Sequence, residues 1–139
     1  MADPLWLTAF DLGEAAELLD PGLPRVEVHG GIPPRPAGEW LAVVPVSGTG
    51  PLWISGVVQV SEYRRGWRSG LLWYHVERRI ALPCPVPLPL ERFREASRPL
   101  DGELLQVVRT LCEEVQRGKL RESLEGLPGV GAVEAGGKP

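Results

Sequence analysis

The chain has 139 residues, with 15 Lys and Arg against 18 Asp and Glu, a net charge of −3 and 43% hydrophobic residues. This length fits one small globular domain whose core can stabilise the fold without disulfides or a metal ion. No apolar run is long enough to cross a bilayer, and residues 1–10 lack the basic start of a signal peptide. We therefore expect a cytoplasmic protein with no membrane partner. Cys84 and Cys112 form no CxxC pair, so both are expected to be reduced, buried thiols with no zinc site.

The first predicted elements are a short strand and a capped helix. Residues 5–10 are mostly apolar, and Asp11 is followed three residues later by Glu14, which is the spacing of a capping box. We therefore expect a helix over residues 12–19, which ends at the Pro-Gly pair that follows it.

A half-buried strand is predicted next. Polar and apolar residues alternate over residues 25–29, and this period of two places Arg25, Glu27 and His29 on one face. Residues 30–38 contain three prolines and three glycines, so they are expected to form a loop.

The centre of the sheet is predicted from three further segments. Residues 40–46 and 52–60 are apolar and rich in β-branched side chains, and a Gly-rich stretch joins them. Residues 63–70 are basic and bounded by glycine, which predicts a hairpin loop. Residues 71–80 then form another strand, with Leu72, Tyr74 and Val76 on one face and Trp73, His75 and Glu77 on the other.

The last third of the chain begins with four alternating prolines in residues 82–90, which predict a sheet edge or an extended crossing because proline cannot donate to a neighbouring strand. A helix is expected to start after Asp101, to carry an apolar stripe at three- and four-residue spacing, and to end at Gly118. Residues 120–124 are expected to add a short helix, and residues 126–139 a flexible tail.

The segment from Gly22 to His29, which reads Gly-Leu-Pro-Arg-Val-Glu-Val-His, resembles the motif Gly-x-Lys-x-x-Glu-x-Arg of the ASCH family of PUA-like domains. Gly22 and Glu27 match this motif, as does Val26, whereas Pro24 stands at the lysine position and His29 at the arginine position. The strand and helix before the motif and the Pro-rich loop after it are similar to the family's order, and the likeness spans residues 5–90.

The resemblance implies an α+β fold, a small PUA-like mixed β pseudo-barrel of five or six strands with a helix near the N-terminus and an amphipathic C-terminal helix. It implies one domain over residues 1–125, with a cleft between the barrel and the first helix whose floor is the motif strand. The family includes a hydrolase of acylated cytidine that uses the motif lysine, and members that bind or cleave RNA. Pro24 cannot supply that amine, and the guanidinium of Arg25 stays protonated.

The positive charge gathers in one segment, since residues 61–80 carry a net charge of +3. Arginines alternate there with aromatic rings, a pattern that suits single-stranded nucleic acid because phosphates need cations and unstacked bases need flat rings. The predicted nucleic-acid contacts are Arg25, Tyr63, Arg64, Arg65, Trp67, Arg68, Tyr74 and His75. The alternative interpretation is a solvated hairpin loop with Trp73 or Tyr74 in the core.

Three functions remain open at this point. The first is a cofactor-free module that binds RNA or single-stranded nucleic acid, with Glu27 and His29 contacting a base. The second is a hydrolase of a nucleoside or RNA with Glu27 as general base and His29 as general acid. The third is a protein-interaction domain that uses the helix over residues 101–118 or the exposed prolines. Glu27 paired with an arginine on a solvated face is the structural alternative, and the chain is expected to be a monomer or a dimer.

Overall fold

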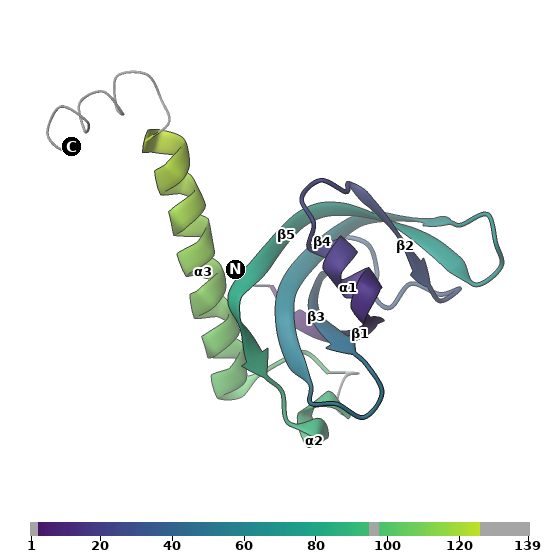
Figure 1. Cartoon of the computed structure of the whole chain (residues 1–139), viewed down its shortest axis with the longest axis horizontal. Helices are drawn as coiled ribbons and strands as arrows, with labels where there is room; N and C mark the ends of the chain where they lie inside the picture. Colours follow the sequence, from purple (N-terminus) through teal and green to yellow (C-terminus); the bar gives the residue numbers. More distant parts are fainter. Residues whose placement is uncertain (1–2, 95–97, 126–139) are drawn as a thin grey trace, which may run out of the picture.

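The fold is given by a computed structural model, which describes residues 3–94 and 98–125. Five strands form one mixed sheet in the order β1-β3-β4-β5-β2, in which β1 is parallel to β3 and the other neighbours are antiparallel. The sheet curls into a half-barrel around α1, and α3 lies outside it (Figure 1). The predicted α+β class and the small, curled mixed sheet are thus confirmed. The elements are β1 (Leu5–Asp11), α1 (Leu12–Leu18), β2 (Arg25–His29), β3 (Trp40–Val46), β4 (Trp53–Arg65), β5 (Leu71–Pro87), α2 (Leu90–Phe93) and α3 (Gly102–Glu125).

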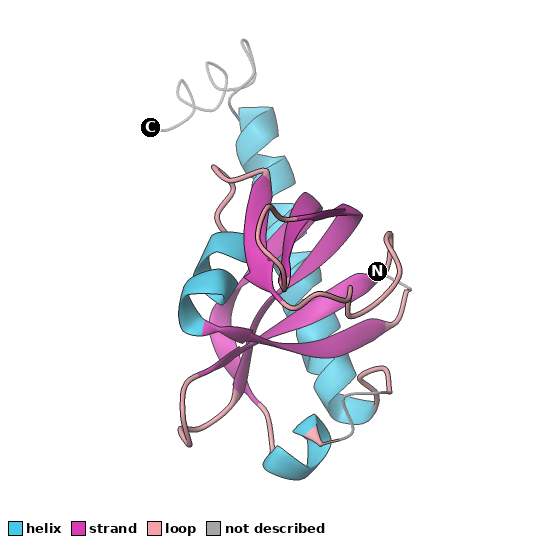
Figure 2. Cartoon of the chain, turned by 90° about the vertical axis from the view of Figure 1, so that its right-hand side faces the viewer, coloured by secondary structure: helices cyan, strands magenta, loops and turns pink. Residues whose placement is uncertain are grey.

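Both faces of the sheet contribute to a hydrophobic core. On the inner face, the residues that pack with Ala15 and Leu18 of α1 include Val26, Val28, Val43 and Tyr74. On the outer face, the central strands pack against α3 through residues such as Val108 and Cys112. Figure 2 shows α3 running along one side of the sheet. None of the helices in the described ranges combines the length and the apolar character needed to cross a membrane.

Several predicted elements are confirmed. The strand over residues 25–29 has the predicted bounds, with Val26 and Val28 buried and Arg25 exposed. The predicted first helix ends one residue earlier than expected, and its capping box joins Asp11 to Glu14. The alternation in residues 71–76 is also confirmed, because Leu72 and Tyr74 are buried while their neighbours are less so.

The predicted hairpin loop was too long. Strand β4 continues as far as Arg65, so the connection to β5 is only residues 66–70. The reason is pairing with β5, because Tyr63 and Arg65 each have a partner residue on that strand. A strand partner outweighs the low β propensity of a charged segment.

The proline-rich segment does not end the strand before it. Strand β5 runs from Leu71 to Pro87 without interruption. Its first five residues pair with β2 on one side, and after them β4 is its one partner among the described strands. Prolines are tolerated there because the open edge needs no donors. The register slips at this point, since one residue of β4 lies opposite four of β5 between the pairs Gly56–Ala81 and Ile54–Val86. The bulge carries Cys84 to the surface, so the prediction of two buried thiols is correct for Cys112 and wrong for Cys84.

The long helix α3 also differs from prediction, because it passes through Gly118 and includes the residues expected to form a separate helix. A glycine inside a helix costs only about 1 kcal/mol relative to alanine, which the remaining turns can offset. The tail predicted over residues 126–139 lies outside the described residues.

Candidate functional site

The tip of the β4–β5 hairpin is the most exposed aromatic position of the described chain. Gly66 donates its backbone N–H to the Leu71 carbonyl at 2.9 Å, and Gly70 adopts a positive φ of 83° that closes the turn. Trp67 lies within this turn, and 91% of its surface is exposed. Trp67 is one of the residues that line a polar hollow of about 400 Å³, together with the rest of residues 65–71 and Gly31.

Three arginines lie close to Trp67 in the sequence of the hairpin. Arg64 is exposed and forms an ion pair with Glu62 at 3.0 Å, while Arg65 and Arg68 are exposed and have no ion-pair partner among the described residues. The predicted group of Arg64, Arg65, Trp67 and Arg68 is therefore gathered at one end of the hairpin. This tip offers an accessible ring and cations that are free to meet phosphates.

The outer face next to the tip carries a second group, in two rows set by strand register. Trp73 of β5 lies between Arg64 of β4 and Glu27 of β2, and the neighbouring row is Glu62, His75 and Arg25. The Arg25 guanidinium carbon lies 5.5 Å from the centroid of the Trp73 ring, which is within the range of a cation–π contact. Arg25 and His75, both predicted to contact nucleic acid, therefore share this face.

The two predicted tyrosines lie on the inner face instead. Tyr74 is buried and packs edge-on against Tyr63, with ring centroids 4.9 Å apart, and against Phe10. Burial raises the pKa of Tyr63 to about 12, with a further contribution from the charge of Glu39, and burial also raises the pKa of Tyr74. Tyr74 is therefore withdrawn from solvent, and Tyr63 is only partly exposed. Trp73, which was not among the predicted site residues, holds the outward position, and the predicted alternation of faces along this strand is the signal that could have identified it.

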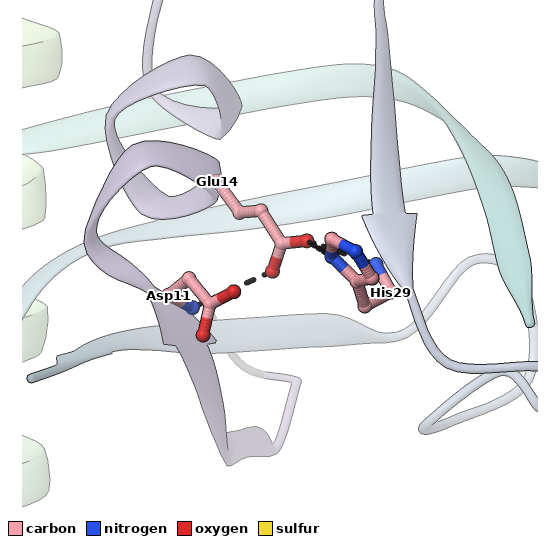
Figure 3. Close-up of side chains that lie close together, drawn as sticks. All are labelled: Asp11, Glu14 and His29. Atoms are coloured by element: carbon pink, nitrogen blue, oxygen red, sulfur yellow. Dashed lines mark hydrogen bonds and ion pairs between the residues drawn. The ribbon is translucent and has the colours of Figure 1, made fainter.

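A cluster of ionisable groups lies where the start of α1 meets the end of β2 (Figure 3). One oxygen of the Glu14 carboxylate accepts the backbone N–H of His29 at 2.9 Å and lies 2.8 Å from Nδ1 of the same residue. The other oxygen accepts the backbone N–H of Asp11 at 3.4 Å. The hydrogen bond to Glu14 and then its charge raise the pKa of His29. Sequence reasoning assigned Glu14 only to the capping box, because the partner of His29 lies 15 residues away along the chain.

This cluster differs from the predicted pairing of Glu27 with His29. The inner surface of β2 that packs with α1 is apolar, made of Val26 and Val28, whereas Glu27 lies on the opposite face. The donor atoms of Asp11, Glu14 and His29 lie within 4.8 Å of one another, and within the described residues no other group of such ligands is gathered in this way. Because both Glu14 oxygens already accept backbone N–H groups, a metal ion would compete with the helix cap.

The loop over residues 30–39 closes one side of the half-barrel. The Arg35 guanidinium carbon lies 3.6 Å from the centroid of the Trp6 ring, and Arg35 also forms an ion pair with Glu39 at 3.2 Å. Beneath it, the Trp6 indole N–H and the Tyr63 hydroxyl are buried and have no hydrogen-bond partner in the described part of the chain. The loop therefore covers polar atoms of the barrel interior.

An apolar hollow of about 760 Å³ lies at the opposite end of the β4–β5 hairpin. It is bounded by residues 46–52 and 87–93, and no charged side chain lines it. The cations and the exposed ring are therefore separated from this apolar hollow.

Comparisons with protein-family models, curated proteins and solved structures found no match for this chain.

Proposed function

We propose that this chain binds RNA or another single-stranded nucleic acid through the tip of the β4–β5 hairpin. The observation that carries the proposal is the exposure of Trp67, at 91%, among Arg64, Arg65 and Arg68. Trp67 is the most exposed large hydrophobic side chain of the described chain, so its ring is accessible to a ligand. Unstacked bases bind such rings, and arginines beside them neutralise the phosphates.

The charge distribution favours a single strand over duplex DNA. The chain as a whole carries a net charge of −3, whereas residues 61–80 carry +3, so the net positive charge is concentrated in the hairpin segment. Non-specific duplex binding needs many phosphate contacts across a broad basic surface. A short single strand needs only a few cations together with rings on which its bases stack.

The proposal also includes the fold family to which the half-barrel belongs. We infer that the half-barrel is a PUA-like domain of the ASCH type, and the support is the order of strand, capped helix, motif strand, Pro-rich loop and central strands. Gly22 and Glu27 match the family motif, although the face of β2 that carries Glu27 points away from α1. We accordingly assign the ligand contacts to the outer face and hairpin tip rather than to a cleft beneath the helix.

A hydrolase of a nucleoside or RNA is the second candidate, favoured by the 2.8 Å contact between Glu14 and His29. A carboxylate that orients an imidazole and raises its pKa produces a general acid near neutral pH. The test is turnover of acylated cytidine or RNA by the wild type and by Glu14→Gln. Stoichiometric binding without product would reject this candidate.

The experiment that tests the binding proposal is a fluorescence anisotropy titration of labelled single-stranded RNA with wild type, Trp67→Ala and Trp53→Ala. Trp53 lies at the other end of β4 and serves as the matched tryptophan control. Loss of one stacked base, worth about 1–3 kcal/mol, weakens binding by roughly 5- to 150-fold in Trp67→Ala, whereas Trp53→Ala binds as the wild type does. No saturable binding by the wild type at tens of micromolar protein would refute the proposal.

A further inference from the structure

We propose that Trp73 is a second base-stacking platform, and that Glu27 beside it selects bases whose Watson–Crick edge presents N–H donors, guanine above all. This inference rests on the proposed function, because it extends the site at the hairpin tip along the outer face of β5. It names the class of ligand as a short single strand that contains guanine.

The register of three strands places the relevant groups side by side. Trp73 is half-buried, with Arg64 directly opposite on β4 and Glu27 directly opposite on β2. Directly opposed residues on one face of an antiparallel pair have Cβ atoms about 4.5–5.5 Å apart. A base stacked on the indole therefore presents its edge within reach of the Glu27 carboxylate.

Glu27 is available for such a contact. Its carboxylate has no hydrogen-bond or ion-pair partner within the described residues, although Arg25 lies two positions away on the same strand face. Arg25 contacts the Trp73 ring instead, 5.5 Å from its centroid, where it can stack on a base or meet a phosphate. An acidic group with no hydrogen-bond or ion-pair partner among the described residues, set directly beside the Trp73 ring and next to Arg25, is suited to read a base rather than the backbone.

The chemistry of a carboxylate determines which base it selects. A carboxylate only accepts hydrogen bonds. Guanine offers two neighbouring N–H donors, at N1 and N2, and the two carboxylate oxygens can accept one hydrogen bond from each. Cytosine and adenine each present one amino group beside ring acceptors. Uracil presents one N–H between two carbonyl oxygens, which the carboxylate repels. The expected order of affinity is guanine, then cytosine and adenine, then uracil.

The second platform is continuous with the first. Leu71 lines the same hollow as Trp67 and shares a strand face with Trp73 two residues further along β5. Two residues of strand span about 7 Å. A single strand of a few nucleotides can therefore place one base at the tip and another on Trp73, whereas a duplex keeps its bases stacked inside.

The test compares an all-uridine RNA octamer with the same octamer carrying one central guanosine, by anisotropy at fixed salt. The wild type is expected to bind the guanosine octamer roughly 10-fold more tightly, within the range for one bidentate base contact. Glu27→Gln abolishes this preference without weakening binding of the uridine octamer. Trp73→Ala weakens binding of both octamers by about 5-fold or more, and Trp73→Phe retains most of the affinity because it keeps a ring. Arg117→Ala on α3 and Trp53→Ala are the matched controls for lost charge and lost indole, and both are expected to bind as the wild type does.

The outcomes separate this inference from the proposed function. If the wild type binds neither octamer, both are refuted. If Trp67→Ala loses binding while Trp73→Ala and Trp73→Phe bind as the wild type does, the proposed function stands and the second platform is refuted. If the wild type binds both octamers equally, or if Glu27→Gln keeps the preference, the role of Glu27 is refuted. Circular dichroism spectra of each variant confirm that it is folded before its binding is compared.

Discussion

Replacement of Gly56 by alanine tests the closest approach between the sheet and α1. Gly56 lies in the middle of β4, opposite Val43 of β3 and Ala81 of β5. A Cβ atom at this position would lie 2.6 Å from the Ile80 carbonyl oxygen and 2.6 Å from Cδ2 of Leu19, the C-cap residue that follows α1. The Leu19 side chain can rotate away, but the carbonyl belongs to the β4–β5 ladder and can move only if the two strands separate.

The size of the effect follows from these contacts. Overpacking of a buried site costs about 1–3 kcal/mol, and a clash with backbone belongs at the upper end of that range. The lower entropy of the unfolded chain with alanine offsets about 0.4–1 kcal/mol. We expect the free energy of unfolding to fall by about 2 kcal/mol, which lowers Tm by roughly 6 °C for a chain of this size.

Thermal and urea unfolding of Gly56→Ala, followed by circular dichroism, measure this change. Gly13→Ala is the matched control, because a Cβ atom at Gly13 of α1 meets nothing within 4 Å and alanine favours the helix. Its Tm is expected to equal or exceed that of the wild type. The double variant Leu19→Ala/Gly56→Ala should lose less unfolding free energy than the sum of the losses in the two single variants, because truncating the Leu19 side chain relieves part of the clash. A Gly56→Ala protein that unfolds at the wild-type temperature would refute the close approach of α1 to β4.

Three further predictions concern charge and chemistry. The affinity for single-stranded RNA should fall as salt rises, and Arg65→Ala should reduce the slope of log K against log salt by about 0.7, while Arg117→Ala leaves it unchanged. Because Glu14 raises the pKa of His29, the NMR titration midpoint of this imidazole should lie above 6.5 and should move down towards that value in Glu14→Gln. The stability that the ion pair contributes to the fold is present below pH 6.5. It is lost as the pH rises through the higher pKa of His29 in the folded state. Ellman's reagent should titrate one thiol in the folded protein, the exposed Cys84, and none in Cys84→Ser, because Cys112 is buried and burial raises its pKa to about 11.

Local patterns were sufficient where neighbours along the chain determine the structure. Alternation over residues 25–29 predicts both the bounds and the faces of β2, because a strand with one buried face cannot shift by one residue without burying its charges. The spacing of Asp11 and Glu14 predicts the start of α1, because both partners of a capping box lie within one turn.

Non-local contacts account for what the sequence did not predict. Pairing with β4 extends β5 through its prolines, and the bulge in that pairing exposes Cys84. The contact between Glu14 and His29 joins residues 15 apart, and it depends on how the sheet curls around α1. No period or motif within a single segment carries that information.

The neighbouring residues Trp73 and Tyr74 show how packing determines which side chains are available for function. Both are aromatic and both follow the basic segment, so composition alone does not distinguish them. The pairing of β2 with β5 places Tyr74 opposite Val26 and Trp73 opposite Glu27. A register shifted by one residue would bury Glu27 and expose Val26 and Val28, at the cost of an unpaired buried carboxylate and lost apolar contacts. The burial of two valines therefore keeps Glu27 and Trp73 together on the outer face, and the same core that stabilises the half-barrel also positions the proposed base-reading pair.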